Sequence, residues 1–253
     1  MTTLSVVVPA LNEEANIAVV VGDLQATIAG MTGQTVELIV VDDGSRDRTA
    51  QVARDLGARV VTNHGRHGKG AALRAGFAEA RGALIAMMDA DHSHRAEELP
   101  RFLEALRDPS VGLVIGSRVV GGSEEYTHVR ALGNVFLSAA LGLCTGRYLS
   151  DALNGFKVFR REVFTEFTYT SRAFEIEIEL IANALRGGYR VVEISSHERA
   201  RAGGEAKSRV IRHGTRFLAR IILEGLRGVR PKVVRAAPAG DPARVDEHAS
   251  SPR

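Results

Sequence analysis

Short runs of β-branched and aliphatic residues alternate along the first half of the chain with longer stretches in which apolar residues recur at helical spacing. This alternation predicts an α/β fold with a mostly parallel sheet flanked by helices. The strands are expected at Leu4–Val8, Val36–Val41, Ala58–Thr62, Leu84–Met88 and Gly112–Ile115. The helices between them are expected at Glu13–Ala29, Arg46–Leu56, Lys69–Ala80 and Ala96–Leu106.

The alternation weakens after Gly116. Helices are predicted at Arg130–Leu143, Phe174–Leu185 and Ser208–Leu226, with an apolar segment around Phe156–Phe159 and a strand at Arg190–Ile194. From Ala236 the chain is rich in Ala, Pro, Ser, Asp and Arg without apolar periodicity, which is typical of a disordered tail. With 253 residues, 45% of them hydrophobic, one core is expected. We therefore predict a single domain over residues 1–230 and a tail over 231–253.

Composition narrows the class of protein. A formal net charge of +3 favours anionic ligands such as phosphates and does not single out nucleic acid as a partner. Cys144 is the single cysteine, so neither an intramolecular disulfide nor a cysteine zinc site can form, and a reducing cytoplasm fits. No stretch reaches the roughly 18 apolar residues that a membrane span needs. Any membrane contact, at the inner face, is therefore expected to be peripheral or through a partner.

Acidic and polar residues follow three of the predicted strands, in Pro9–Glu13, Asp42–Ser45 and Asp89–His94. Ligands of open α/β sheets bind beyond the carboxyl ends of the strands, so these segments are expected on one rim. Asp42–Ser45 alone also suits an ordinary turn and helix cap. Two carboxylates in Asp89-Ala90-Asp91 repel each other unless a cation offsets them, and Mg²⁺ or Mn²⁺ takes such oxygen ligands.

Other nucleotide-binding signatures are absent: no GxGxxG follows the first strand and no GxxxxGK[ST] occurs, which argues against dinucleotide oxidoreductases and P-loop enzymes. The segment His64–Ala71 is glycine-rich and basic and opens a predicted helix. It suits a phosphate site at a helix N-terminus, and it equally suits a flexible solvated loop.

Several motifs in order resemble the inverting family 2 glycosyltransferases of GT-A fold, and among them the polyprenyl-phosphate mannosyl- and glucosyltransferases. The resemblance covers about residues 4–230. Its motifs are Val8-Pro9-x-x-Asn12-Glu13, Val41-Asp42-Asp43-Gly44-Ser45, Gly68-Lys69-Gly70, Asp89-Ala90-Asp91, Gly116-Ser117-Arg118, Asp151-x-x-Asn154-Gly155-Phe156, Phe174-Glu175-Ile176-Glu177 and Arg201-x-x-Gly204-Glu205-Ala206-Lys207.

The resemblance implies roles for individual residues. Those around the donor nucleoside are Pro9, Leu11, Glu13, Val41 and Asp43, and Lys69 joins the donor-binding set. Asp89 and Ala90 border the nucleotide, while Asp91 with Asp89 holds the Mg²⁺ or Mn²⁺ that bridges to the donor diphosphate. The basic residues expected to hold donor and acceptor phosphates are Arg118, Arg201 and Lys207, with Arg130 on the acceptor side.

Two positions depart from the family pattern. Ala206 stands where lipid-phosphate members usually have Ser, which weakens the assignment of the acceptor. Ser93 stands where many members have Gln, which leaves the metal short of one candidate oxygen ligand.

The acceptor decides whether a general base is needed. A phosphate monoester has a second pKa of about 6 and is already mostly dianionic at neutral pH, so a polyprenyl phosphate needs none. A hydroxyl acceptor on a glycan or natural product would need one, and the resemblance places Asp151, Glu175 and Glu177 nearby. We favour the polyprenyl phosphate and keep the hydroxyl acceptor as the alternative.

The final predicted helix combines apolar positions on one side with arginines on its remaining surface, at 209, 212, 216, 220 and 227. Such a helix suits the headgroup region of an anionic membrane, and packing on the domain's own core is the other reading. Two other protein classes remain. A sugar-phosphate nucleotidyltransferase would carry a glycine-rich loop after the first strand, which Pro9–Glu13 is not. A non-catalytic sugar-nucleotide binder is disfavoured by the retained acidic and basic residues.

Overall fold

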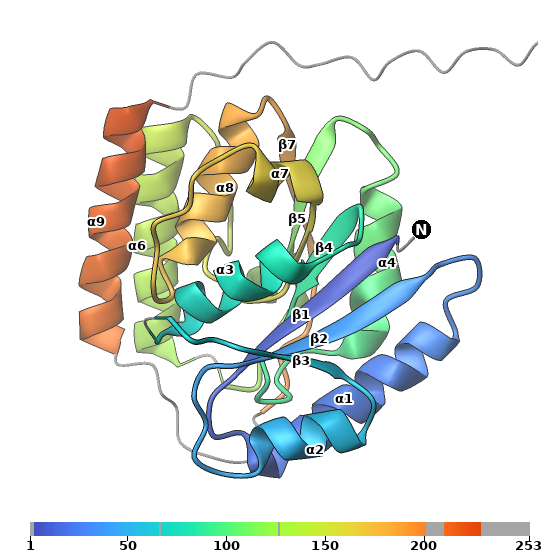
Figure 1. Cartoon of the computed structure of the whole chain (residues 1–253). Helices are drawn as coiled ribbons and strands as arrows, with labels where there is room; N and C mark the ends of the chain where they lie inside the picture. The colour runs from blue at the N-terminus through green and yellow to red at the C-terminus, as the bar shows by residue number, and fades with distance from the viewer. Residues whose placement is uncertain (1–2, 66, 126, 201–209, 229–253) are drawn as a thin grey trace, which may run out of the picture.

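The computed structural model describes residues 3–65, 67–125, 127–200 and 210–228, with only the backbone of 210–212. Seven strands of this part form one sheet in the order β3-β2-β1-β4-β6-β5-β7 (Figure 1). The strands are β1 (Leu4–Ala10), β2 (Val36–Asp42), β3 (Arg59–Thr62), β4 (Leu84–Met87), β5 (Val111–Ser117), β6 (Lys157–Arg160) and β7 (Arg190–Ser195). Only β6 is antiparallel to its neighbours, β4 and β5. The predicted α/β fold with a mostly parallel sheet is confirmed.

Helices cover both faces of the sheet, so there is a core cluster on each face. Successive side chains of a strand point to opposite faces, and those of β1 therefore pack in different clusters. Val6 and Val8 pack in one core cluster with α1 (Glu14–Ala29), α2 (Thr49–Asp55) and α4 (Leu99–Ala105). The residue between them, Val7, packs in the other cluster. The helices of that second cluster are α3 (Lys69–Glu79), α6 (His128–Thr145), α7 (Arg161–Thr165), α8 (Ile176–Arg186) and α9 (Val210–Arg227).

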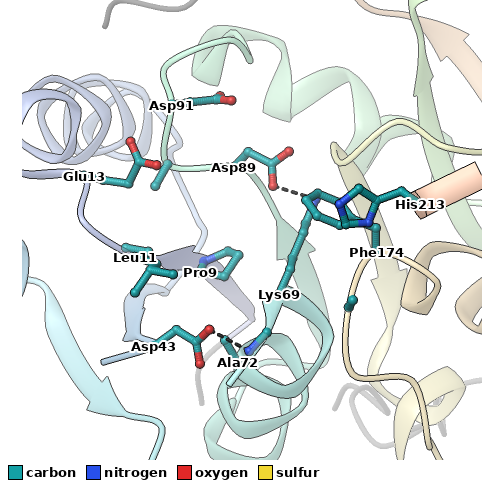
Figure 2. A pocket seen from close by; sticks show the side chains of 14 residues that line it. Pro9, Leu11, Glu13, Asp43, Lys69, Ala72, Asp89, Asp91, Phe174 and His213 are labelled. Carbon is teal, nitrogen blue, oxygen red and sulfur yellow. Dashed lines mark hydrogen bonds and ion pairs between the residues drawn. The ribbon is translucent and has the colours of Figure 1, made fainter. Parts of the chain in front are cut away.

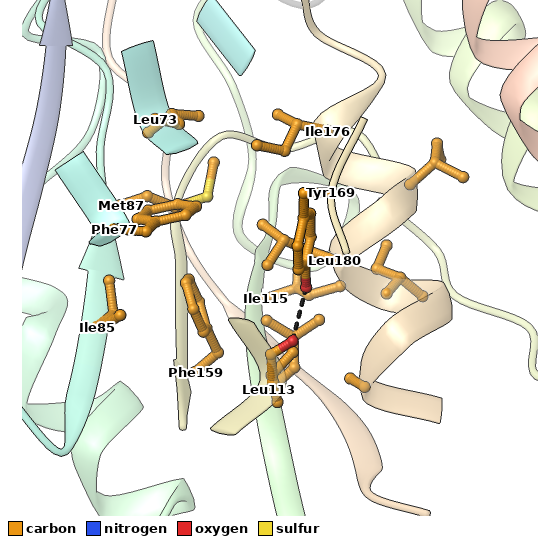
Figure 3. Close-up of a cluster of buried hydrophobic side chains, with 14 of the residues drawn as sticks. Leu73, Phe77, Ile85, Met87, Leu113, Ile115, Phe159, Tyr169, Ile176 and Leu180 are labelled. Atoms are coloured by element: carbon orange, nitrogen blue, oxygen red, sulfur yellow. Dashed lines mark hydrogen bonds between the residues drawn. The ribbon is translucent and has the colours of Figure 1, made fainter. Parts of the chain in front are cut away.

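The second cluster is mostly aliphatic and includes a few aromatic side chains (Figure 3). Phe77 of α3 meets Phe159 of β6 edge-to-face, with ring centroids 5.1 Å apart. The Tyr169 hydroxyl donates to the carbonyl oxygen of Val163, 2.8 Å away. Phe159 belongs to β6, which lies between β4 and β5 in the sheet. The antiparallel strand therefore contributes to the same core as α3.

The five predicted strands of the first half are confirmed to within two residues at each end. The predicted start of a helix at Arg46 is wrong, because α2 begins at Thr49. The backbone N–H of Arg46 donates to Asn12 Oδ1 (2.8 Å), and Asp47 Oδ1 accepts from the N–H of Thr49 (3.0 Å). These side-chain acceptors hold the segment as a turn. The helix predicted at Ala96–Leu106 is present as η1 (Ala96–Glu98) followed by α4. Short helices that the sequence pattern did not predict are α5 (Arg118–Gly121) and α7 (Arg161–Thr165).

The last helix, α9, packs against α6 and α8 (Figure 1). Phe217 and Ile221 point into the core. Arg220 was expected on the surface, but that prediction is wrong: it is buried, and its guanidinium lies 3.1 Å from Glu179 Oε1 and 2.9 Å from Glu224 Oε1. Among the described residues, no helix has the length and apolar content to cross a membrane. Arg201, Lys207 and the predicted tail lie outside the described residues.

Candidate active site

A cavity of about 280 Å³ lies at the carboxyl ends of β1, β2 and β4 (Figure 2). It brings together most of the residues predicted to bind the donor, which are Pro9, Leu11, Glu13, Asp43, Lys69, Asp89, Ala90 and Asp91. The side chain of Val41 is not among its lining; it is fully buried in the core under α3. The convergence of the three strand ends on one rim therefore holds for every proposed donor residue except that side chain.

Asp42 and Asp43 have different roles: Asp42 stabilises the turn, and Asp43 lines the cavity. Asp42 Oδ1 accepts from the N–H of Ser45 (3.1 Å) and closes the turn. Asp43 is buried, and its carboxylate accepts from Asn63 Nδ2 (2.6 Å) and from the backbone N–H of Gly68 (2.7 Å). Asp43 therefore both lines the cavity and anchors the loop that leads into α3.

That loop depends on glycine at position 68. Gly68 has φ of +135°, and a Cβ there would lie 2.4 Å from the carbonyl oxygen of Arg172. Gly68→Ala is therefore expected to destabilise the protein by about 1–3 kcal/mol in urea denaturation, through backbone strain and a clash with main chain. Gly22→Ala in α1 is the matched control, since no atom lies within 4 Å of the added Cβ. It should leave stability equal or about 0.5–1 kcal/mol higher. Equal destabilisation by both changes would contradict this account.

The loop after β4 presents two carboxylates to the cavity. His92 has φ of +64°, a left-handed conformation that turns the chain directly after Asp91. Asp91 is buried, and its Oδ1 accepts from the Ser93 hydroxyl (2.6 Å) and the Ser93 N–H (3.2 Å). Ser93 therefore orients Asp91 within the loop.

Asp89 and Asp91 fit a hard divalent cation only as part of a larger ligand set. No group of three or more His, Cys, Asp or Glu side chains within the described ranges has the geometry to hold a metal. Mg²⁺ and Mn²⁺ are commonly held by one or two carboxylates with water and substrate phosphate supplying the other oxygens. The two carboxylates on one cavity wall match that arrangement.

Charged side chains continue from Asp89 into the protein interior as a row of alternating sign. Lys69 Nζ lies 2.7 Å from Asp89 Oδ1 and 3.0 Å from Glu177 Oε1. Glu177 Oε2 lies 2.5 Å from Nζ of Lys157, and neither of these two side chains has appreciable solvent exposure. The Lys157 ammonium also donates to the carbonyl oxygen of Asn154. Glu177, a base candidate, is thus enclosed between two lysines.

The pKa values of the row follow from burial and pairing. Burial would lower the pKa of Lys69, but the carboxylates of Asp89 and Glu177 outweigh it and raise that pKa. Burial would likewise raise the pKa of Asp89, but Lys69 and His94 outweigh it and lower the pKa. Burial lowers the pKa of Lys157 despite the opposing attraction of Glu177. Lys69 and Asp89 are therefore an ion pair at neutral pH.

Because Gly155 has no side chain, it leaves space for the Lys69–Asp89 ion pair. A Cβ at this position would lie 2.5 Å from Asp89 Oδ2 and 3.0 Å from Lys69 Nζ. Asn154 fixes the turn, because its Nδ2 donates to the carbonyl oxygen of Gly116 (2.5 Å) and its Oδ1 accepts from the N–H of Phe156 (3.1 Å). Asn154 and Gly155 of the Asp151–Phe156 motif therefore allow the backbone of this turn to pack closely against the Lys69–Asp89 pair.

A second cavity of about 200 Å³ adjoins the first. The residues that line both are Lys69, Asp89, Asp91, Phe174 and His213. The second cavity is otherwise lined from β5 onward and by the loop after β4, and it includes Arg118 and Arg130. The two cavities therefore meet at the ion pair and the acidic loop.

Arg118 is held in place by carboxylates. Its Nε and Nη2 lie 2.7 and 2.8 Å from the two carboxylate oxygens of Asp151, and its Nη1 lies 3.2 Å from Glu198 Oε1. Asp151 is fully buried. Arg130 Nη1 is 3.9 Å from Glu125 Oε2. Arg118, predicted to hold donor and acceptor phosphates, and Arg130, predicted on the acceptor side, thus both line this cavity. Arg118 has close carboxylate partners, whereas the pairing of Arg130 is long.

The three carboxylates named as base candidates all have structural partners. Asp151 holds Arg118, and Glu177 is enclosed by Lys69 and Lys157. Glu175 Oε1 accepts from the backbone N–H groups of Arg172 and Ala173, 3.2 Å away in each case. Neither Glu175, Glu177 nor Asp151 lines either cavity.

Sequence reasoning missed His213 altogether. Its ring lies edge-on to Phe174, with centroids 4.7 Å apart, and Phe174 covers Lys69 with Nζ 5.2 Å from the ring centroid (Figure 2). Phe174 belonged to a quoted motif, whereas His213 lies in a helix read only for its apolar and basic pattern. The contact depends on how α9 packs, which no local signal encodes.

Comparison with characterised proteins places this geometry in context. The chain is 37% identical over 186 residues to the low-salt glycan biosynthesis hexosyltransferase Agl6 of Haloferax volcanii, covering 72% of this chain and 44% of that protein. It is 30% identical over 200 residues to the dolichyl-phosphate hexose transferase of the same organism, covering 79% and 84%. The chain thus spans less than half of the first relative and most of the second.

Among solved structures, the fold matches glucosyl-3-phosphoglycerate synthase from Mycobacterium tuberculosis in complex with Mn²⁺, uridine diphosphate and glucosyl-3-phosphoglycerate. The TM-score is 0.70 at 28% sequence identity, covering 88% of this chain and 80% of that one. The sheet and its flanking helices thus correspond to the expected GT-A fold. The model of glycosyl transferase family 2 matches residues 5–168, which hold the donor-side loops and the Asp151–Phe156 motif. The chain therefore belongs to glycosyl transferase family 2 and is a glycosyltransferase.

Proposed function

We propose that this enzyme transfers a hexose from GDP-mannose or UDP-glucose to a polyprenyl phosphate, with inversion at the anomeric carbon and with Mg²⁺ or Mn²⁺ as cofactor. The observation that carries the proposal is the pair of adjoining cavities that meet at Lys69, Asp89 and Asp91. A donor in the first cavity and an acceptor in the second would bring their reacting atoms together at this junction. Residues 1–230 would form the catalytic domain.

The first cavity suits a nucleotide sugar. Its apolar wall at Pro9 and Leu11 and the buried carboxylate of Asp43 offer packing and hydrogen-bond acceptance to a nucleoside. Asp91 and Asp89 would hold the metal, which when bound neutralises charge on the leaving diphosphate. Lys69 stands beside them as a second cation. The Mn²⁺ and uridine diphosphate of the related synthase support this assignment.

The second cavity suits an anionic acceptor. Arg118 is fixed there with Arg130 nearby, and the three base candidates are all engaged elsewhere. An acceptor phosphate oxygen would attack the anomeric carbon as the bond to the diphosphate breaks, and the electron pair would leave with the nucleoside diphosphate. A phosphate dianion has no proton to remove, so the lack of an available base among these candidates favours it.

A hydroxyl acceptor remains the second candidate. The related synthase is named for a phosphoglycerate acceptor and shares 28% identity with this chain. Because such an acceptor also carries a phosphate, the cations of the second cavity would suit it as well. We propose the cytoplasmic face of the membrane as the place of the reaction; a chain with a single cysteine forms no internal disulfide, which suits a reducing compartment.

The test is donor turnover by the purified full chain with Mg²⁺ or Mn²⁺, offering GDP-mannose, UDP-glucose or UDP-N-acetylglucosamine. The acceptors are a short polyprenyl phosphate, the matching polyprenol without phosphate, 3-phosphoglycerate, and none. We expect release of nucleoside diphosphate that requires both the lipid phosphate and the metal, and that EDTA abolishes. Turnover with the alcohol or with 3-phosphoglycerate alone would replace the acceptor assignment. Failure of every donor to bind would overturn the proposal.

A further inference from the structure

Most of the large apolar side chains that face solvent in the described part of the chain lie on α6 and α9. On α6, Leu132, Phe136 and Leu143 are 73%, 60% and 89% exposed. On α9, Ile222 and Leu226 are 51% and 82% exposed. Soluble monomers rarely expose apolar side chains in contiguous groups, so such a face indicates something that covers it.

The exposed positions of the two helices adjoin. Residues 129, 132, 136 and 143 of α6 are three, four and seven apart, a spacing that keeps them on one side of a helix. The two helices lie side by side (Figure 1), and Gly225 of α9 packs against Cys144 of α6. Leu143 precedes Cys144 and Leu226 follows Gly225, so both leucines lie next to the contact between the two helices. We call this exposed apolar face the α6–α9 surface; it consists of Val129, Leu132, Phe136, Leu143, Ile222 and Leu226.

The solvent-facing charges that α6 and α9 themselves carry, as far as their side chains are described, have one sign; Glu125, just before α6, is paired with Arg130. Residues 128–145 contain no Asp or Glu. The one acidic residue of α9, Glu224, is buried and lies 2.6 Å from Arg186 and 2.9 Å from Arg220. On α9, Arg216 and Arg227 are exposed. An apolar face with a basic rim matches the headgroup region of an anionic bilayer. A two-fold dimer would instead set the arginines of one copy against those of the other.

The same two helices border the second cavity. Val129, Arg130 and Gly133 of α6 and His213, Gly214 and Phe217 of α9 line it. Val129 belongs to both the lining and the α6–α9 surface, and it is 67% exposed. The cavity thus reaches solvent at the edge of the apolar face, with its other end at Asp89 and Asp91.

From this arrangement we infer that the α6–α9 surface docks on an anionic lipid bilayer. Docking would set the mouth of the second cavity at the depth of lipid phosphates. The role we give this docking, bringing the enzyme to its acceptor, rests on the proposed lipid-phosphate acceptor. The docking itself requires no donor, metal or turnover.

The experiment is flotation of the full chain with vesicles, without donor or metal. The chain is expected to float with vesicles containing phosphatidylglycerol and far less with pure phosphatidylcholine. Leu132→Glu combined with Phe136→Glu should lower the bound fraction about tenfold or more, because two apolar contacts are lost. Val19→Glu, at an exposed apolar position of α1, is the matched control and should bind like the wild type. Arg216→Glu should lower binding to anionic vesicles about tenfold, and Arg107→Glu, in the turn that follows α4, should not.

A second readout separates this inference from the proposed function. Turnover with a short, water-soluble polyprenyl phosphate in the absence of vesicles should be the same for the Leu132→Glu, Phe136→Glu variant and the wild type. Wild-type protein that does not float overturns the inference, whatever its turnover. It is also overturned if the wild type is a dimer without lipid and the α6 variant is a monomer, since a second copy then covers the face.

Discussion

Asp91→Asn is expected to lower the turnover number by about 10²–10³-fold, the usual loss when one preorganised electrostatic group is removed from an active site. The amide keeps an oxygen that can accept from Ser93, so the loop should hold its shape. What it loses is the negative charge that would bind the metal beside the donor diphosphate. The measurement is initial rate at saturating donor over a series of Mn²⁺ concentrations.

The matched control is Asp55→Asn, an exposed carboxylate at the end of α2. It should leave the turnover number within about twofold, as expected for a surface change. Thermal unfolding of both variants should match that of the wild type. A fully active Asp91→Asn enzyme would remove Asp91 from the metal site, whereas recovery at high Mn²⁺ would show that only metal affinity had changed.

Glu177→Gln is expected to destabilise the fold by about 3–5 kcal/mol, because it leaves Lys157 and Lys69 without their shared buried carboxylate. Urea denaturation measures this loss. As a control, Glu104→Gln breaks the exposed Arg107–Glu104 pair and should cost less than about 1 kcal/mol.

A double variant distinguishes the effect of Glu177 on stability from its effect on Lys69 at the cavity. Glu177→Leu with Lys157→Met replaces the buried pair by apolar side chains of similar size, which is often neutral for stability. Lys69 would then retain only Asp89 as its partner. We expect stability to recover while the KM for the donor is higher than that of the wild type, since Glu177 positions Lys69 at the cavity. If activity recovers together with stability, Glu177 serves the fold alone.

The parts of this site that sequence could predict are those encoded over a few adjacent residues. The β1, β2 and β4 strands are self-contained apolar runs, and Asp89 and Asp91 follow such a run directly. Their meeting on one rim needs only the parallel arrangement of the strands. The lining of the first cavity was therefore predicted almost residue by residue, with the side chain of Val41 as the exception. Donor binding by these residues stays a prediction.

What sequence could not predict depends on partners far along the chain. Nothing local sets the direction of β6, yet its antiparallel course brings Lys157 to Glu177, 20 residues away. A Glu in a helix motif reads equally well as a base and as the partner of two buried lysines. The capping of a loop by Glu175 and the position of His213 likewise depend on tertiary packing. The roles of Arg201 and Lys207 stay predictions.

The way the two cavities divide the chain bears on how such an enzyme can diversify. Apart from Ala173, Phe174 and His213, the first cavity is lined by residues up to position 91. The second takes most of its lining from Arg118 onward, and the shared wall is small. Under the proposed assignment of donor to the first cavity and acceptor to the second, selection on one segment would change the acceptor while the other segment kept the donor. Chimeras joined between β4 and β5 would be the natural way to recombine donor and acceptor specificities among relatives of this fold.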